Sequence, residues 1–188
     1  MATDMKADAG DRGERWLKVS IGLLRFELGM MPLVQQLGKL DVRLIEADAV
    51  WTPRFVNEKL SEEDSASLHE HITLSYLWVL GAYEFVRTLC QRVEDDDPKT
   101  PAAVRNKITD VRNRFERVRV PLAKMEKSRR FRDVDGAVAY PGMRRGFGVA
   151  WRLNENTWIS RRELSDALLE VLEARRAAFL DWRAQHRD

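Results

Sequence analysis

Apolar residues in the first part of the chain recur at alternating intervals of three and four positions. The row consists of Trp16, Val19, Leu23, Phe26, Met30, Leu33, Leu37, Leu40, Leu44, Ala47 and Trp51. This spacing predicts an α-helical segment over residues 12–50 with one apolar face. Pro32 lies inside the row and has no backbone donor, so the segment is either one kinked helix or a pair of helices. Because the row keeps its phase across Pro32, we expect a kink.

The next helix is expected over residues 61–97 and carries two adjacent apolar rows. Thr52-Pro53 and the polar residues after it predict a connection between the first helical segment and this helix. Ser61 or Ser65 is expected to cap the first turn. The first row contains Leu68, Ile72, Ser75, Val79, Ala82, Val86, Leu89 and Val93, and the second contains His71, Leu74, Trp78 and Phe85. A helix with two apolar faces is buried on more than one side, so we expect it at the centre of the fold.

A third apolar row predicts a basic helix over residues 100–131. Thr100 supplies the expected N-cap and Pro101 the first helical position. Pro121 is expected to kink this helix, because its ring clashes with the preceding turn. The row contains Val104, Ile108, Val111, Phe115, Val118, Leu122 and Met125.

The composition changes over residues 133–159, where glycine, β-branched and aromatic residues predict short strands and a β-hairpin. Within VAWRL, alternation places Val149, Trp151 and Leu153 on one face, and residues 154–157 form the expected turn. Ser160-Arg161-Arg162-Glu163 has capping-box spacing and begins a final helix over residues 161–186. We therefore expect residues 1–188 to form a single, mainly α domain. It is an elongated antiparallel bundle of four to five long helices, with a small β-hairpin inserted before the C-terminal helix.

The charge of the chain is strongly segregated, although its net value is only +2. Residues 99–162 carry 17 Lys or Arg and 6 Asp or Glu, whereas residues 1–98 carry 11 and 18. Such a basic region indicates contact with nucleic-acid phosphates, or attraction to an acidic part of the fold or to an acidic protein partner. The candidate binding residues are Arg105, Arg112, Arg119, Arg129, Arg130, Arg144 and Arg145.

The stretch RRGFGVAW, residues 144–151, resembles the opening of the ribonucleoprotein octamer of RNA-recognition motifs. Counting from Arg145, a basic residue, a glycine, an aromatic residue and a small residue match that octamer. Its fifth and eighth positions are aromatic in the motif but are Val149 and Arg152 here. We therefore interpret the stretch as part of a hairpin whose arginines extend the basic face.

The sequence contains no complete metal-binding or nucleophilic motif. His69 and His71 point about 200° apart on a helix, so they cannot share an ion, and we expect no metal and no cofactor. We expect His71 to pack or cap and His69 to be solvated. The one cysteine, Cys90, lies among apolar helix positions and is expected to be a buried, inert thiol.

Glu84 is the candidate for acid–base chemistry, because it lies between Tyr83 and Phe85 on the helix expected to be most buried. It forms either a structural ion pair, with Arg87 or an arginine of the basic helix, or a general acid or base in a pocket. Long bundle helices with a buried acidic residue are similar to the HEPN ribonucleases. That resemblance implies an HEPN-like nuclease or another hydrolase centred on Glu84. The HEPN signature is an Arg and a His separated by four to six residues on one helix, and none of the three histidines of this chain has an Arg at that separation.

The expected class follows from these patterns. The longest uncharged stretch, residues 72–83, is shorter than the ~20 residues that cross a bilayer. A single cysteine forms no intrachain disulfide, so we expect a cytoplasmic protein without membrane contact. Our main hypothesis is a non-enzymatic helical protein that binds another macromolecule and self-associates through its long apolar rows. The alternatives are a nucleic-acid-binding protein that uses the basic helix and the Arg144/Arg145 turn, and the hydrolase.

Overall fold

The computed structural model describes residues 2–23, 29–57, 59–96 and 100–186. The elements are α1 (Ala2–Ile21), α2 (Met30–Asn57), α3 (Glu62–Asp96), α4 (Ala102–Lys124), the short 3-10 helix η1 (Arg129–Phe131), β1 (Tyr140–Arg144), β2 (Gly148–Arg152), β3 (Trp158–Ser160) and α5 (Arg161–Gln185). The expected mainly α fold, with a small antiparallel sheet before the C-terminal helix, is confirmed.

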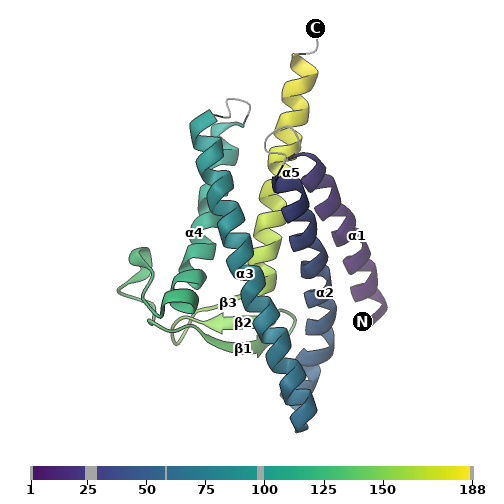
Figure 1. Cartoon of the computed structure of the whole chain (residues 1–188), viewed down its shortest axis with the longest axis vertical. Coiled ribbons are helices and arrows are strands. Elements are labelled where there is room, and N and C mark those ends of the chain that lie inside the picture. The colour runs from purple at the N-terminus through teal and green to yellow at the C-terminus, as the bar shows by residue number, and fades with distance from the viewer. Residues whose placement is uncertain (1, 24–28, 58, 97–99, 187–188) are drawn as a thin grey trace.

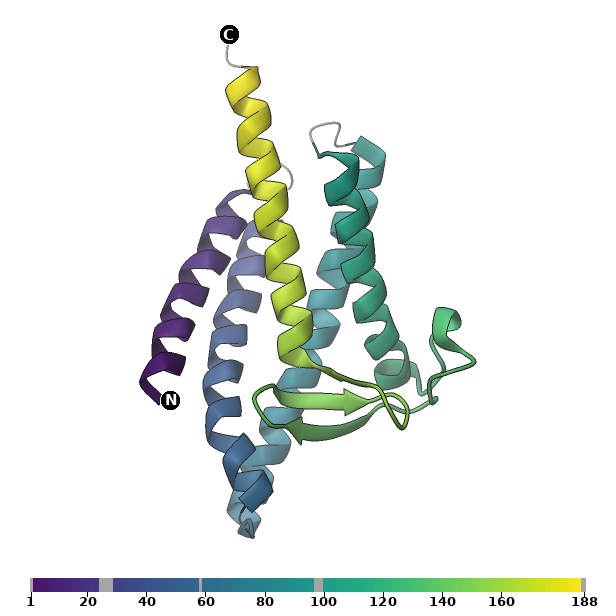
Figure 2. The same cartoon turned by 180° about the vertical axis from the view of Figure 1, so that it is seen from behind.

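The helices run alternately up and down, and the sheet lies across one end of the bundle (Figure 1). Helix α3 contacts α2, α4 and α5, so its expected central position is confirmed. Helix α5 starts at the sheet and packs against α1 and α4, as the reverse view shows (Figure 2). The core is therefore continuous from α1 to α4, and large side chains such as Trp16, Trp78, Phe115 and Trp151 fill it.

The expected kink at Pro32 is wrong, because α1 and α2 are separate helices that lie side by side and run in opposite directions (Figure 1). Pro32 is the third residue of α2. Its missing N–H is one that the first turn of a helix leaves unused, so proline starts this helix instead of bending it. Trp16, Val19 and Leu23 of the first half of the apolar row and Leu37 and Leu44 of the second half are buried in the same core, which explains why the row continues across two helices. Leu33 of the row is exposed and its neighbour Val34 is buried instead, and Phe26 lies outside the described residues.

Gly38 allows α1 and α2 to approach closely, and we expect Gly38→Ala to destabilise the protein. A Cβ at Gly38 would lie 2.5 Å from the Cβ of buried Trp16. The free energy of unfolding, measured in urea, should fall by about 2 kcal/mol, because overpacking outweighs the better helix propensity of alanine. Gly13→Ala is the matched control, since its nearest contact is 3.9 Å away. It should raise the same free energy by about 0.5–1 kcal/mol, and equal effects of both changes would contradict this interpretation.

Helix α2 extends to Asn57, so the expected connection at Thr52-Pro53 is wrong. Pro53 removes only one backbone hydrogen bond. The last turns are held because Asp48 and Thr52 are buried and because α2 contacts β1 and β2. The expected cap at Ser61 is confirmed, because its Oγ accepts a hydrogen bond of 3.1 Å from the backbone N of Asp64.

Helix α4 is shorter than the expected basic helix at both ends. Its N-cap is Pro101, one residue later than predicted, and it ends at Lys124, where the C-cap Met125 has a left-handed φ of 54°. A left-handed residue at this position stops a helix. The arginines that follow therefore lie on a folded loop and on η1 instead of on α4, which corrects the predicted range of 100–131.

The sheet has the order β1-β2-β3, with both pairs antiparallel. Gly142 pairs with Ala150, and Ala150 pairs with Ser160. The predicted hairpin is confirmed as β2–β3, and β1 adds a third strand. Val149, Trp151 and Leu153 are buried as expected, and so is Ala150.

The predicted capping box at the start of α5 is confirmed. The backbone N of Glu163 donates to Ser160 Oγ (3.0 Å), and the Ser160 N donates to Glu163 Oε2 (2.8 Å). Since β3 ends at the residue that caps α5, the sheet and the helix are joined without a loop.

Candidate functional site

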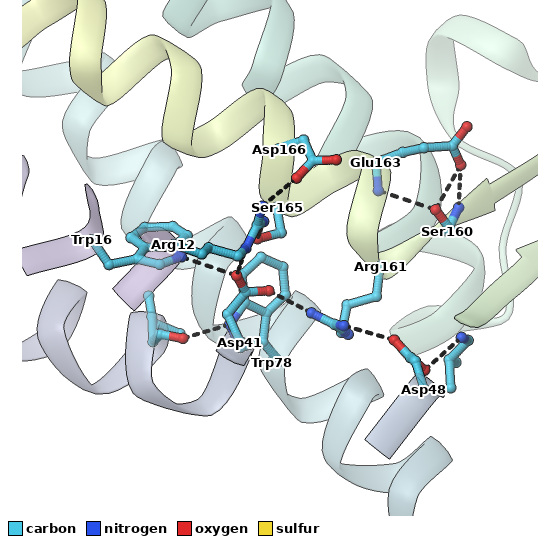
Figure 3. Close-up of polar contacts among 12 residues, drawn as sticks. Arg12, Trp16, Asp41, Asp48, Trp78, Ser160, Arg161, Glu163, Ser165 and Asp166 are labelled. Carbon is cyan, nitrogen blue, oxygen red and sulfur yellow. Dashed lines mark hydrogen bonds and ion pairs between the residues drawn. The ribbon is translucent and has the colours of Figure 1, made fainter. Parts of the chain in front are cut away.

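Two buried carboxylates and two buried arginines connect α1, α2 and α5 in a buried ionic network, defined here as Arg12, Asp41, Asp48, Arg161 and His71 (Figure 3). Arg12 Nε donates to Asp41 Oδ2 at 2.6 Å, and Arg161 Nη1 donates to Asp41 Oδ1. The indole of Trp16 adds a third donor to Asp41 at 2.9 Å. Asp41 is therefore held by three donors from two helices.

Asp48 is the second carboxylate of the network and joins α2 to α3 and β2. Arg161 Nη2 donates to its Oδ2 at 2.8 Å. His71 Nε2 lies 2.8 Å from Oδ1, and the backbone N of Val149 donates to the same oxygen at 3.0 Å. A carboxylate oxygen accepts, so the Nε2 of His71 carries the hydrogen in this contact. The expectation that His71 packs while His69 is solvated is confirmed.

Burial alone would raise the pKa of Asp41, but the positive charges of Arg161 and Arg12 outweigh it and lower that pKa. Asp41 is therefore a carboxylate in the folded protein. The fully buried Arg161 bridges it to Asp48, and Arg12 also pairs with the partly exposed Asp166 at 2.6 Å, so two arginines are shared among three carboxylates. With every carboxylate oxygen of Asp41 and Asp48 engaged, we interpret the network as a clamp between elements rather than as reactive groups.

The buried ionic network was not predicted from the sequence, although part of its signal was present. Asp41 and Asp48 are seven residues apart and flank the apolar row of α2, a spacing that places both on one side of a helix. Arg161 carried no such signal, because it lies 120 residues from Asp41 and occupies the first turn of α5.

Glu84 does not lie where the hydrolase hypothesis requires it. Its side chain is 51% exposed, Arg87 Nε donates to it at 2.8 Å, and Arg119 lies 3.8 Å away. Helix α3 buries two faces and turns this position toward solvent between them. The interpretation of Glu84 as one member of an ion pair is confirmed, and its expected burial in a pocket is wrong.

Cys90 is buried as predicted. Burial raises the pKa of its thiol, and the hydroxyl of Thr109, 3.6 Å from Sγ, partly opposes this effect. A thiol with a raised pKa is a poor nucleophile at neutral pH. Among the described residues, no group of three His, Cys, Asp or Glu side chains is arranged to hold a metal ion.

The seven predicted binding arginines fall into three groups. Arg105, Arg112 and Arg119 lie along α4, half-buried, and Arg119 stacks 5.2 Å from the ring of Tyr83 on α3. Arg105 Nε donates to the carbonyl of Thr100 at 2.9 Å. Arg112 Nη2 donates to Oδ1 of the neighbouring Asn113 at 3.1 Å. Each of these three side chains therefore has a contact within the protein, and phosphate binding by them stays a prediction.

The other two groups lie at opposite ends of the sheet. Arg144, which pairs with Glu163 at 3.1 Å, and the exposed Arg145 belong to the β1–β2 turn, which faces α2. Arg129 and Arg130 lie on η1, beyond the other end of the strands (Figure 1). The predicted set therefore does not converge on one cleft.

The densest group of cations is the segment Lys124–Arg132, called the basic loop below. It contains five basic residues and one acidic residue, all of them exposed: Lys124, Glu126, Lys127, Arg129, Arg130 and Arg132. None of the five cations forms an ion pair or hydrogen bond within the part of the chain that the structure describes. They are available to an external anion.

Side chains of α4 and of the β2–β3 turn anchor the basic loop. Arg117 donates to both oxygens of the buried Asp135, at 2.7 and 2.8 Å, and Asn154 donates to Asp135 at 2.9 Å. The guanidinium of Arg117 also lies 4.1 Å from the ring centre of Phe131. These contacts fix both the loop and the hairpin turn, so the cations project from a folded support.

A groove of about 440 Å³ adjoins the basic loop and is lined by Lys127, Val138, Tyr140 and Arg152, among others. Tyr140 is 57% exposed, and the guanidinium of Arg152 lies 5.7 Å from its ring centre. Asp133, Asp135 and Glu155 also line the groove, and Asp135 is paired with Arg117, so the charge of the groove is nearly balanced. It offers an exposed aromatic face beside a strongly basic segment.

No helix in the described ranges has the length and apolar character needed to span a membrane. The fold and site define a mainly α protein in which a three-stranded sheet supports an exposed basic loop. Comparisons with protein-family models, curated proteins and solved structures find no match to this chain.

Proposed function

We propose that this is a nucleic-acid-binding protein that contacts phosphates with its basic loop. The observation that carries the proposal is the presence of five exposed, unpartnered cations within nine residues of the described chain. Neutralising phosphates releases counterions, which makes such a segment a favourable and sequence-tolerant contact for a polyanion. The anchor through Arg117 and Asp135 supports the proposal, because a pre-ordered loop loses less conformational entropy on binding.

The groove next to the loop favours a single strand over a duplex. A nearly neutral groove does not attract phosphates, but the exposed ring of Tyr140 can stack on an unpaired base. In this arrangement the basic loop holds the backbone and Tyr140 holds a neighbouring base. Val149 and Trp151, in the stretch that resembles an RNA-reading strand, are buried and do not stack on bases in this arrangement, while a role for Arg144 and Arg145 stays a prediction.

The sequence predicts a macromolecular partner, and this proposal specifies a nucleic acid. Of the expected binding residues, the proposal relies on Arg129 and Arg130, which are exposed, while a role for the half-buried Arg105, Arg112 and Arg119 stays a prediction. Self-association, a cytoplasmic location and an acidic protein partner remain predictions. No observation favours the HEPN-like hydrolase, whose candidate Glu84 is exposed and paired with Arg87.

The test replaces three cations of the loop, Arg129→Gln, Arg130→Gln and Arg132→Gln, in one variant. Fluorescence anisotropy with labelled single-stranded oligonucleotides, over a salt series, should show binding by the wild type. The variant should bind about tenfold more weakly at ~100 mM salt, and the slope of log affinity against log salt should be shallower by about 2, since each lost phosphate contact contributes ~0.7.

The matched control removes three exposed cations elsewhere, by Lys39→Gln, Arg43→Gln and Lys59→Gln, with the same change in net charge. It should bind nearly as the wild type does, because these three cations lie outside the basic loop. Any effect of net charge alone is the same in both variants, so the difference between them reports the loop. Equal losses in the two variants would contradict the assignment to the loop. Absence of binding at every salt concentration would end the proposal, and preference for an acidic peptide over oligonucleotides would favour the protein partner.

A further inference from the structure

A second pocket lies between the C-terminal half of α2 and the β1–β2 turn. Figure 2 shows that this turn and the basic loop are at opposite ends of the strands. The volume of the pocket is about 190 Å³. A cavity of ~150 Å³ lined by apolar side chains is large enough for benzene. The pocket therefore has room for one six-membered ring, or a short aliphatic chain, with a small polar group.

The body of the pocket is apolar and its mouth is basic. Ile45, Ala49, Pro53 and Phe147 supply apolar surface. Arg145 and Arg162 also line the pocket. Arg145 is exposed and makes no ion pair or hydrogen bond within the described residues.

Neither of the two buried polar residues of the pocket offers a free polar group to a ligand. Asp48 is saturated, because it accepts from Arg161, His71 and the Val149 backbone, so its charge is compensated from within the protein. Thr52 is 8% exposed, and its Oγ1 is enclosed, with no hydrogen-bond partner among the described residues. The accessible polar group that can orient a ligand is therefore the guanidinium of Arg145.

We propose that this pocket binds a small organic monocarboxylate, with an apolar body against Ile45 and Ala49 and a carboxylate facing Arg145. An arginine binds a carboxylate through paired donors in a fixed plane, which explains why a cation belongs at the mouth of an apolar pocket. The site is separate from the basic loop, so its occupancy does not depend on nucleic-acid binding.

Isothermal titration calorimetry on the full chain tests the proposal with four probes: benzoate, cyclohexanecarboxylate, benzamide and inorganic phosphate. Both carboxylates should bind saturably, benzamide about tenfold more weakly because it lacks the charge, and phosphate not measurably because it lacks the apolar body. No saturable binding of either carboxylate in the millimolar range overturns the proposal. So does benzamide or phosphate binding as well as benzoate.

Three variants locate the binding. Arg145→Gln should weaken benzoate about tenfold, and Ala49→Leu should abolish binding by filling the pocket, with circular dichroism used to check its fold. Arg43→Gln, which removes an exposed cation of α2 outside the pocket, should leave the affinity unchanged. Because Arg145 is exposed, we expect Arg145→Gln to fold normally, so this variant still tests the site if Ala49→Leu does not fold. Benzoate affinity that is unchanged in Arg145→Gln places the carboxylate elsewhere and overturns the assignment.

Discussion

Arg161→Met is expected to lower the free energy of unfolding by about 3–5 kcal/mol, the cost of breaking a buried ion pair by removing one partner. Arg161 is 0% exposed and is the residue that bridges Asp41 and Asp48. Without it the two carboxylates remain buried with fewer donors. Arg12 and Trp16 still donate to Asp41, and His71 still contacts Asp48. We therefore expect a destabilised fold with the same helical content. Urea unfolding followed by circular dichroism measures the change.

The matched control for this prediction is Arg15→Met. Arg15 on α1 also pairs with an acidic residue of α5, Glu173, at 2.7 Å. That pair is about one-third exposed on both sides, so solvent screens it and its loss should cost only about 0.2–1 kcal/mol. Because both variants lose an ion pair and only Arg161→Met loses a buried one, the difference between their free energies of unfolding measures the effect of burial. If both variants lose the same stability, the buried ionic network is not the clamp described above.

Gly148→Ala is expected to lower the free energy of unfolding by about 3 kcal/mol or more, through two separate effects. Gly148 has a φ of 72°, in the left-handed region that alanine adopts at a cost. A Cβ at this position would also overlap the carboxylate of Asp48. Asp48 would have to move away from the Val149 N–H and from His71, which leaves buried groups unsatisfied.

Gly146→Ala distinguishes the two effects. Gly146 lies two residues earlier, has a similar φ of 78°, and would place its Cβ in open space. It should therefore cost only the backbone term of about 1–2 kcal/mol. Thermal and urea unfolding of the two variants should differ by at least about 1 kcal/mol. Equal stabilities would mean that the contact between Asp48 and the β1–β2 turn contributes nothing measurable.

Most helices, and the cap of α5, were predictable because they depend on neighbours in the sequence. The apolar spacing on α3 and the capping box at Ser160 and Glu163 are local signals, and the structure agrees with both. Errors occurred where a local breaker had a tertiary role. Pro32 lies in the first turn of α2. Pro53 lies inside the same helix, which the sheet stabilises by packing against it.

Candidate sites were harder to predict than elements. Glu84 has aromatic neighbours in sequence, but the helical turn directs it to solvent while Phe85 is buried. The arginines of α4 share a sevenfold spacing, yet that spacing only places them on one side of a helix. Whether that side faces solvent or α3 depends on packing, and Arg119 lies over the ring of Tyr83 on α3. The unpartnered cations of the basic loop follow instead from where α4 ends.

By itself the sequence determined the class of fold, the central position of α3, the β2–β3 hairpin and the segregation of basic residues, because periodicity, turn residues and composition act over short distances. Only the tertiary structure decided which charges are buried together. Asp41 and Arg161 are 120 residues apart, and their pairing depends on α1, α2 and α5 meeting in one core. The pocket beside Thr52 has the same origin, since its walls come from α2 and from a turn about 100 residues further along.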